Sequence, residues 1–549
     1  MMMFETVLEE VGSFGRFQIL TIILLASHRI TMPMHFLLNV FTAALPSHHC
    51  DISTLDDGVH FQNLTHEQRL AVSIPVGDDG GMKSCEMFVE PQFQLLSNGS
   101  NSTNLPTVQC QSGWVYDRST FTSTLATEWD LVCERKQLAK ATSTIFFIGV
   151  ATASLVFGFF CDKFGRKNAL LVAYIIGFVF GISSAFSNSY TMFAVLRFFT
   201  GFGITGFDMT TIVLCIEWVD VGHRSFTGVM MSQAWSAGNM LLAGFAYLVN
   251  DWRMLTITVT APLGFALLSW WWIPESARWL LTSGRVDKAV FYLNRCAHIN
   301  KKPKSSLKLK LQTLSSAKIQ EKQQQNNSYY HLIKTPKMRR LTLATGVVWF
   351  GVSMAFFAIS LNISGFEMNM YLTHFAYAAI EVPANFVSTF LLNAIGRKKC
   401  QSGALLLTGA CVAINIFIPK GLWHVRAIVA IIGKGLAEIS SLTVTVYTTE
   451  LFPTVLRQKG FGYNSVMGRV GSSVAPLVLM LEDVWTPLPQ IIICSVVITS
   501  TLVSLLLPET LNVRLPETID DIENPRDHTP SHPMESADVL LETKPVIEQ

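Results

Sequence analysis

The sequence predicts an all-α integral membrane protein, with twelve spanning helices in two related six-helix halves and a large extracellular loop between the first two helices. Three observations predict this fold class: an apolar composition, regularly spaced apolar runs and an internal repeat of charged motifs. Of the 549 residues, 50% are hydrophobic and only 15% are charged, and the mean hydropathy is +0.37. Soluble domains carry roughly 25% charged residues, so this chain needs lipid against its apolar surface. The net charge of +2 gives no indication of a nucleic-acid partner.

The apolar runs have the length of membrane spans. A helix needs about 20 mostly apolar residues to cross the hydrocarbon core of a bilayer. No basic segment precedes the first run, so we expect a retained anchor helix there rather than a cleaved signal peptide. The expected spans are residues 17–38, 141–161, 169–187, 191–217, 226–249, 253–273, 341–364, 371–393, 402–419, 423–447, 460–481 and 486–507.

Basic residues in the short loops predict the orientation. The segments DKFGRK (162–167), HRS (223–225), PKMRR (336–340) and GRKK (396–399) would share one side of the membrane, and the positive-inside rule makes that side the cytosol. Both termini then lie in the cytosol. The expected segments are a cytosolic N-terminus (1–16), an N-terminal half (17–273), a cytosolic loop (274–340), a C-terminal half (341–507) and a cytosolic tail (508–549).

The loop over residues 44–138 would lie outside the cell. It is rich in acidic residues and holds four cysteines, which predict two disulfides with the pairing left open: Cys50, Cys85, Cys110 and Cys133. Free thiols are the alternative, which an oxidising exterior disfavours. We expect the other six cysteines to be reduced. Three sequons for N-glycosylation in the same loop agree with this orientation: Asn63, Asn98 and Asn101.

Three motifs of the first half recur in the second half, in the same order and with nearly the same separation. Gly165-Arg166 corresponds to Gly396-Arg397, and EWVDVGHR (217–224) corresponds to ELFPTVLR (450–457). The third pair is PESARW, which begins at Pro274, and PET, which begins at Pro508. Two halves of this kind predict parallel repeats related by an axis along the membrane normal, with a ligand site between them near the midplane.

The charged residues of these motifs suggest a latch between the halves. Paired charges on short cytosolic loops could hold the halves together when the cytosolic side is closed, so breaking them would shift the balance between inward-facing and outward-facing states. The alternative is that they only fix the topology. The candidate latch residues are Asp162, Gly165, Arg166, Glu217, Arg224, Gly396, Arg397, Glu450 and Arg457.

Several sequence blocks resemble one known family. The pattern GxxxDxxGRK at 158–167 resembles the signature of the major facilitator superfamily, and PESARWLL at 274–281 its branch of sugar and organic-ion carriers. FTAALPSHHC (41–50), WDLVC (129–133), ELFPTVLRQKG (450–460) and LPET (507–510) are similar to solute carrier family 22. HFLLNVF, LLVAYI and EWVDVGHR are most similar to the type 2 subgroup of its organic anion transporter branch.

The resemblance implies a polyspecific carrier in the plasma membrane. It would move small organic anions and zwitterions by alternating access, as facilitated diffusion or as exchange against a counter-anion. The lipid bilayer is the one further partner that the sequence implies, and the oligomeric state stays open. No metal-ligand spacing, nucleophile–base pair or P-loop is present, so we expect no metal, no cofactor, no enzymatic activity and no ATP-driven pumping.

Ionisable residues inside spans are costly and are therefore candidates for the substrate site. Arg469 stands where organic anion carriers have arginine, and its planar fork suits a carboxylate, although a structural ion pair is the alternative. Lys434 matches a family position on the substrate path, whereas we favour Arg197 as a structural partner of Asp208 or Glu217. Three intramembrane acids would either pair with these bases or admit zwitterions and weak cations: Asp208, Glu381 and Glu438.

Aromatic residues are the second part of the expected site, because ring faces hold planar substrates with loose selectivity. The resemblance assigns Trp235, Trp349, Phe356, Phe357 and Tyr377 to the cavity. Two departures from the family pattern follow: Asn385 replaces a base, which puts dicarboxylate exchange in doubt, and Ser441 replaces a bulky aromatic residue. Met32 and His35 in the first span are weaker candidates.

Two other functions are compatible with parts of the sequence. A carrier of organic cations or carnitine-like zwitterions could use Asp208 or Glu438. A membrane receptor that transports nothing could use the large loop, although it would have no need of charged motifs repeated in both halves.

Overall fold

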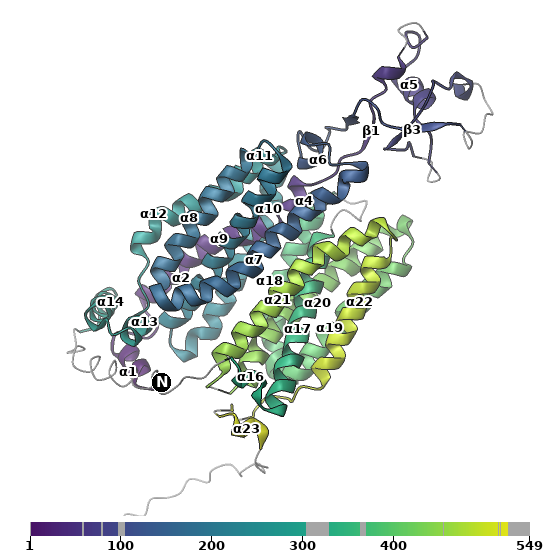
Figure 1. Cartoon of the computed structure of the whole chain (residues 1–549). Coiled ribbons are helices and arrows are strands. Elements are labelled where there is room, and N and C mark those ends of the chain that lie inside the picture. The colour runs from purple at the N-terminus through teal and green to yellow at the C-terminus, as the bar shows by residue number, and fades with distance from the viewer. Residues whose placement is uncertain are drawn as a thin grey trace, which may run out of the picture.

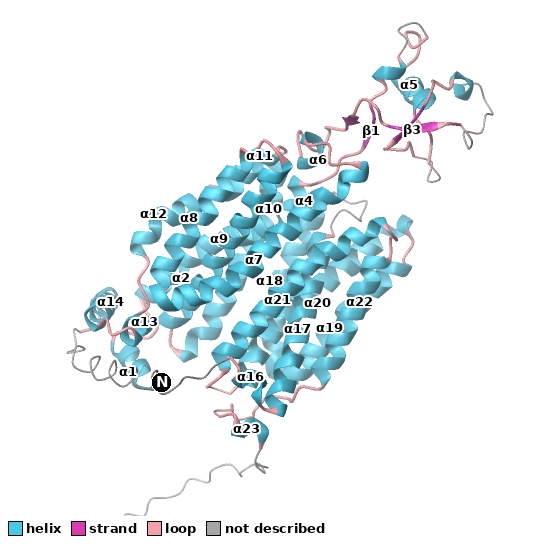
Figure 2. Cartoon of the chain, in the orientation of Figure 1, coloured by secondary structure: helices cyan, strands magenta, loops and turns pink. Residues whose placement is uncertain are grey.

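The computed structural model is a long bundle of helices in two side-by-side halves (Figures 1 and 2). It describes residues 2–56, 60–77, 81–96, 105–303, 329–362, 369–453, 455–513, 515–516 and 518–524. The sequons at Asn98 and Asn101 lie outside the described residues.

In the described part of the N-terminal half, the first and the last spans are each broken into shorter helices, with four long helices between them. The first span runs from Arg16 to Thr42 and consists of α2 (Arg16–Arg29), α3 (Thr31–Leu37) and α4 (Asn39–Thr42). Pro33 lies in the first turn of α3, where its missing N–H has no helical partner to lose. The remaining helices are α7 (Lys136–Phe164), α8 (Arg166–Ala185), α9 (Tyr190–Trp218), α10 (Arg224–Leu248), α11 (Trp252–Thr260) and α12 (Pro262–Ser269).

Among its described residues, the C-terminal half has six long helices, each of them continuous. Pro383 and Pro476 lie inside two of its helices, as bundled membrane helices tolerate when neighbours satisfy the freed backbone groups. Its helices are α17 (Pro336–Leu361), α18 (Met370–Ile395), α19 (Arg397–Phe417), α20 (Trp423–Leu451), α21 (Arg457–Met480) and α22 (Leu488–Leu505).

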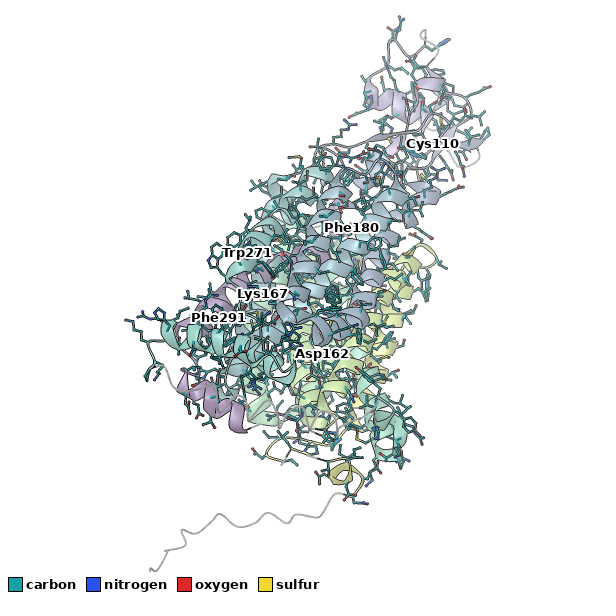
Figure 3. All side chains as sticks on the ribbon, turned by 60° about the vertical axis from the view of Figure 1, so that its left-hand side comes forward. Cys110, Asp162, Lys167, Phe180, Trp271 and Phe291 are labelled. Carbon is teal, nitrogen blue, oxygen red and sulfur yellow. A yellow bond between two sulfur atoms is a disulfide. The ribbon has the colours of Figure 1, made fainter. Side chains whose placement is uncertain are left out.

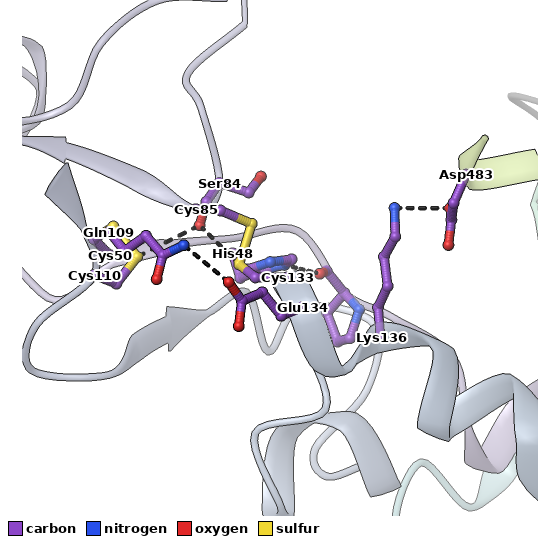
Figure 4. Close-up of a disulfide and its surroundings, with 11 residues drawn as sticks. His48, Cys50, Ser84, Cys85, Gln109, Cys110, Cys133, Glu134, Lys136 and Asp483 are labelled. Atoms are coloured by element: carbon purple, nitrogen blue, oxygen red, sulfur yellow. Dashed lines mark hydrogen bonds and ion pairs between the residues drawn. A yellow bond between two sulfur atoms is a disulfide. The ribbon is translucent and has the colours of Figure 1, made fainter. Parts of the chain in front are cut away.

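A small lobe projects from one end of the bundle, between α4 and α7 (Figure 1). Two antiparallel strand pairs form its centre: β1 (His48–Cys50) with β4 (Trp114–Tyr116), and β2 (Glu86–Phe88) with β3 (Thr107–Gln109). It also holds α5 (His66–Ser73) and α6 (Leu125–Glu128). The two predicted disulfides are present, as Cys50–Cys110 and Cys85–Cys133 (Figure 4). The other six cysteines are free, as predicted.

Short helices gather at the opposite end, which we name the tail end: α1 (Met2–Glu10), α13 (Ala277–Thr282), α14 (Val286–Ile299), α16 (His331–Lys334) and α23 (Asp520–Glu523). The N-terminus and the last described residues therefore lie at the same end. Asn300, just after α14, joins this layer to the bundle, because its Oδ1 accepts a hydrogen bond from the Phe17 N–H of α2 (2.9 Å) and its Nδ2 donates to the Gly12 carbonyl (3.1 Å).

Ten helical segments in the described part of the chain are long and apolar enough to cross a membrane. The helices α10 and α21, with 25 and 24 residues, have the length but are not among the ten. Both carry polar residues because they pack against the other half, α10 on α18 and α21 on α7. Inward-facing polar side chains lower the mean hydropathy of a helix without exposing charge to lipid.

Large apolar side chains cover the outside of the bundle. Leu268 and Trp271 of the N-terminal half are each 72% exposed, as is Phe390 of the C-terminal half. Trp271 lies at the outer edge in Figure 3. Such a surface is typical of contact with lipid rather than water.

Candidate functional site

A chain of three charged side chains crosses from one half to the other. The Nε atom of Arg29 on α2 lies 2.7 Å from Oδ1 of Asp208 on α9, and Nη2 of Arg469 on α21 lies 3.7 Å from Oδ2 of the same carboxylate. Arg29 also donates from Nη1 to the carbonyl of Met231 on α10. Asp208 is buried, whereas Arg469 keeps 20% of its side chain exposed. The sequence-predicted pairing of Arg469 with an intramembrane acid is therefore present, but the acid is shared.

Lys434 forms a second buried cluster in the C-terminal half. Its Nζ lies 3.0 Å from Oε1 of Glu381 on α18, with the two side chains only 1% and 0% exposed. The same nitrogen donates to Oγ of Ser360 (2.7 Å) and lies 3.0 Å from the centre of the Phe356 ring. A buried charge needs such partners, because an isolated ammonium in a low-dielectric interior is costly. Lys434 is thus neutralised, and it is less available to an anion than Arg469.

Glu381 also joins the two halves. Its Oε2 accepts hydrogen bonds from Ser236 Oγ (3.1 Å) and Asn239 Nδ2 (3.4 Å), both on α10. A small cavity beside this contact is lined by Leu37, Asn239, Ser360, His374, Tyr377, Ala378, Glu381 and Lys434. Glu438 lies one helical turn after Lys434 on α20 and is buried. Among the described residues it has neither an ion pair nor a hydrogen-bond partner.

The predicted aromatic residues largely come together in one cluster that spans both halves. Phe36 of α3 contacts Trp235 and Phe357, with ring centres 5.6 and 5.7 Å apart. Phe356 lies 6.5 Å from Trp235 and 5.2 Å from Phe357. The Arg469 guanidinium lies 5.9 Å from the Phe36 ring, so the cluster borders the charged chain. Sequence reasoning did not single out Phe36.

Other predicted residues have different surroundings. Trp349 donates from Nε1 to Thr448 Oγ1 (2.7 Å) and packs against Phe461, inside the C-terminal half. Asn385, one turn after Glu381 on α18, is buried, and neither atom of its amide has a partner among the described residues. Ser441 is partly buried on α20.

The two candidates from the first span are fully enclosed. Met32 is buried in the core. His35 is 0% exposed, and neither of its ring nitrogens has a hydrogen-bond partner in the described part of the chain.

The prediction for Arg197 is wrong. It pairs with neither Asp208 nor Glu217: its Nη2 donates to the His35 carbonyl (3.1 Å), and its guanidinium lies 4.6 Å from the Phe146 ring. Arg29, and not Arg197, pairs with Asp208. Sequence reasoning missed Arg29, although a signal existed, namely a base within an expected span.

The repeated motifs form two equivalent junctions, each inside one half. Arg166 pairs with Glu217 (Nη2–Oε1 3.0 Å), and Arg397 pairs with Glu450 (Nε–Oε2 3.0 Å). Asp162 adds a second acid to Arg166 (3.3 Å). Arg224 begins α10, and Arg457 begins α21 and donates to the Phe452 carbonyl (3.3 Å). These ion pairs stay within a half in this structure, so a latch between the halves stays a prediction.

Two repeated helical halves around a buried, charged and aromatic centre define a membrane transporter of the major facilitator type. The model of the family "Sugar (and other) transporter" matches residues 98–521. The solved structures of the proton:xylose symporter XylE, one of them with bound 6-bromo-6-deoxy-D-glucose, share this fold. That structure has a TM-score of 0.59 at 14% identity and covers 91% of this chain and 98% of its own, and the inward-open XylE from E. coli has a TM-score of 0.56 at 15% identity, covering 91% and 98%.

The chain belongs to solute carrier family 22. It is 41% identical to solute carrier family 22 member 7 of Bos taurus and 40% identical to that of Homo sapiens, with 95% of this chain and 96% of each relative covered. It is 35% identical to member 6-B of Xenopus laevis, with 95% of both chains covered. The predicted family and subgroup are confirmed, and the protein is a multi-pass membrane transporter and not an enzyme.

Proposed function

We propose that this protein is a polyspecific transporter of small organic anions and zwitterions in the plasma membrane, working by alternating access. The observation that carries the proposal is the setting of Arg469, a partly exposed arginine between the halves. Its acidic neighbour Asp208 is already paired with another arginine, Arg29.

Arg469 has donors to spare for a carboxylate. Its guanidinium carries five N–H groups, and the Asp208 oxygen at 3.7 Å is beyond hydrogen-bond distance. No described residue accepts a hydrogen bond from these groups. A substrate carboxylate could therefore take two of them side by side, which is the geometry that arginine favours.

The aromatic cluster would hold the organic part of the substrate. Phe36, Trp235, Phe356 and Phe357 offer ring faces and carry no hydroxyl group. Recognition through ring faces depends on shape and area, so many planar substrates are expected to fit. Glu438, which has no ion-pair partner among the described residues, supports the acceptance of zwitterions, whose cationic group could approach it.

Alternating access agrees with where the halves meet. At the lobe end, Lys136 of α7 pairs with Asp483 of the other half (2.8 Å; Figure 4). Lys140 of the same helix pairs with Glu482 (3.6 Å). Deeper in the bundle, Ser473 Oγ donates to the Phe147 carbonyl (3.0 Å). These contacts support a state closed at the lobe end, and rocking of one half against the other would open it.

The membrane topology can be inferred from the two halves and from the positions of the tail end and the lobe. We infer twelve spans, counting α10 and α21, with the tail end in the cytosol and the lobe outside the cell. Two disulfides in the lobe support this orientation, because disulfides persist in oxidising surroundings. Asn63 of the lobe would carry a glycan, and the masses of Asn63→Gln, Asn98→Gln and Asn101→Gln would show which sequons are used.

The test is uptake of a labelled aromatic carboxylate into cells that express the chain. Arg469→Asp is expected to lower uptake at least about tenfold per surface copy, since it replaces a charge-assisted donor with a repelling carboxylate. Arg469→Lys keeps the positive charge but loses the planar fork, so its uptake should lie between that of the parent chain and that of Arg469→Asp. Unchanged carboxylate uptake in Arg469→Asp, at equal surface amount, would refute the assignment.

A carrier of organic cations or carnitine-like zwitterions is the second candidate. The buried Glu438, which has no ion-pair partner in the described part of the chain, favours it. Such a carrier would take up cations faster at more negative membrane potential and would leave carboxylates outside. A cation panel measured under voltage control separates the two functions.

A further inference from the structure

The Arg29–Asp208 pair does not itself bind an anion in the proposed function, but it lies next to Arg469, which does. Asp208 can offer its charge to either arginine. Arg29 holds it at 2.7 Å, within hydrogen-bond distance, whereas Arg469 lies farther out at 3.7 Å. The carboxylate is therefore committed to Arg29.

Two contacts fix Arg29 in this position. Its Nε donates to Asp208 on α9, and its Nη1 donates to the backbone carbonyl of Met231 on α10. The side chain is only 12% exposed, and its partner Asp208 only 3%. A guanidinium with two anchored donors on two helices keeps one geometry, because moving it would strand a buried carboxylate.

The charges decide what the centre attracts. Arg29, Asp208 and Arg469 together carry a net charge of +1, located on the exposed member, Arg469. Without Arg29 the net charge of this group is zero, and Asp208 would be free to bond with Arg469. Lys434 in the second cluster cannot replace the lost positive charge, because it is already paired with Glu381.

We propose that Arg29 is a specificity-determining residue: by occupying Asp208, it leaves Arg469 free for the carboxylate of the substrate. This role rests on the proposed anion transport. Arg29 acts through Asp208 and does not touch the substrate, so it is a positioning residue.

The proposal predicts a rescue. Arg29→Gln should raise the KM for a labelled aromatic carboxylate about tenfold or more and should improve uptake of organic cations relative to carboxylates, because Asp208 becomes available to Arg469 and to cations. The double variant Arg29→Gln with Asp208→Asn removes both charges and leaves Arg469 unpaired. Its carboxylate KM should return to within about threefold of the parent chain.

Two controls separate this role from a merely structural one. Arg29→Lys keeps the positive charge beside Asp208 and should keep the preference for carboxylates. Arg197→Gln removes another buried arginine of the same half, which contacts the His35 carbonyl and not Asp208, and should leave the carboxylate KM unchanged per surface copy.

Each outcome decides between explanations. A double variant that stays as poor as Arg29→Gln overturns the proposal, because Arg29 would then bind the substrate itself. An unchanged KM in Arg29→Gln also overturns it, as does a loss of preference in Arg29→Lys. If the parent chain takes up no carboxylate, the proposed function fails, which is a different result from any of these.

Discussion

The junction that joins α7 to α8 in the first half and the one that joins α18 to α19 in the second have the same construction. In each, the arginine that begins a helix after a glycine bonds with the acid near the end of the next helix, Arg166 with Glu217 and Arg397 with Glu450. In each, the backbone N–H of the arginine donates to a second acid from the end of the half, Glu275 or Glu509, at 2.9 Å.

The two junctions differ in charge and in burial. Asp162 gives Arg166 a second acid, whereas Asn393 stands at the equivalent position of the other half. Glu275 is only 7% exposed, and burial raises the pKa of its carboxyl. Burial also acts to raise the pKa of Glu509, but the backbone N–H groups of Leu511, Arg397, Thr510 and Lys398 outweigh it, so this pKa lies below its usual range.

The contacts that both junctions share lie within a half and stabilise it. The arginine, the glycine and the two acids connect helix ends within a half. Asp162, which only the first junction has, could have a different role. Asp162 is 76% exposed and has no counterpart, so it is the residue of the junction best placed to meet the other half. We propose it as the contact of a latch in another state of the transport cycle.

The largest effect is expected from alanine at the two junction glycines. Gly165 and Gly396 have φ values of +98° and +92°, and an added Cβ would lie 2.5 Å from Glu275 Oε2 and 2.6 Å from Glu509 Oε2. A positive φ alone costs about 1–2 kcal/mol for an alanine, and the clash adds to it. Surface expression should fall severalfold in both variants, more in Gly165→Ala because the Trp279 ring lies only 2.8 Å from its added Cβ.

The control uses glycines with open surroundings. An added Cβ meets nothing within 4 Å at Gly158 on α7 or at Gly403 on α19. Gly158→Ala and Gly403→Ala should express as the parent chain does. Equal expression of all four variants would mean that the junctions tolerate strain and do not stabilise each half.

A medium effect is expected from neutralising the acids. Glu450→Gln leaves Arg397 without its acid, and it also weakens the bond from Thr510 Oγ1 (2.6 Å), so the loss of stability should be about 2–3 kcal/mol. Glu217→Gln should cost about half as much, because Arg166 keeps Asp162. Thermal unfolding of the purified proteins in detergent measures both.

Adding Asp162→Asn to Glu217→Gln makes the first junction resemble the second. The double variant should then lose as much stability as Glu450→Gln. If the double variant unfolds at the same temperature as Glu217→Gln alone, Asp162 does not support Arg166, and the proposed asymmetry is wrong.

The smallest effect on stability, and the most informative one on transport, is expected from Asp162→Asn alone. The exposed side chain should leave the melting temperature within about 1 °C of the parent chain. Turnover should fall a few-fold at unchanged KM if Asp162 latches the halves in another state. The reverse change, Asn393→Asp, serves as a matched control, and equal turnover in all three chains would reduce Asp162 to a topology signal.

The sequence was informative in two respects: motifs that recur in both halves, and charged residues inside spans, where burial of a charge is costly. The nearly constant separation of the repeated motifs predicted two halves, and both junctions have matching contacts. Arg469, Lys434 and Glu381 were visible because charges within apolar runs need partners. Arg29 had the same signal and was missed, and Arg197 was assigned to the wrong partner, because a base in a span does not reveal which helix faces it.

The sequence by itself determined that this chain is a membrane protein of two related halves, since composition, periodicity and repeated motifs are properties of the chain, and its sequence blocks carried the resemblance to solute carrier family 22. Only the tertiary structure decided who pairs with whom: Cys50 with Cys110, Arg29 rather than Arg197 with Asp208, and each junction arginine with an acid of its own half. The physical reason is distance. Hydrogen bonds and ion pairs act over a few ångströms, and packing of helices far apart in the sequence sets which side chains come that close.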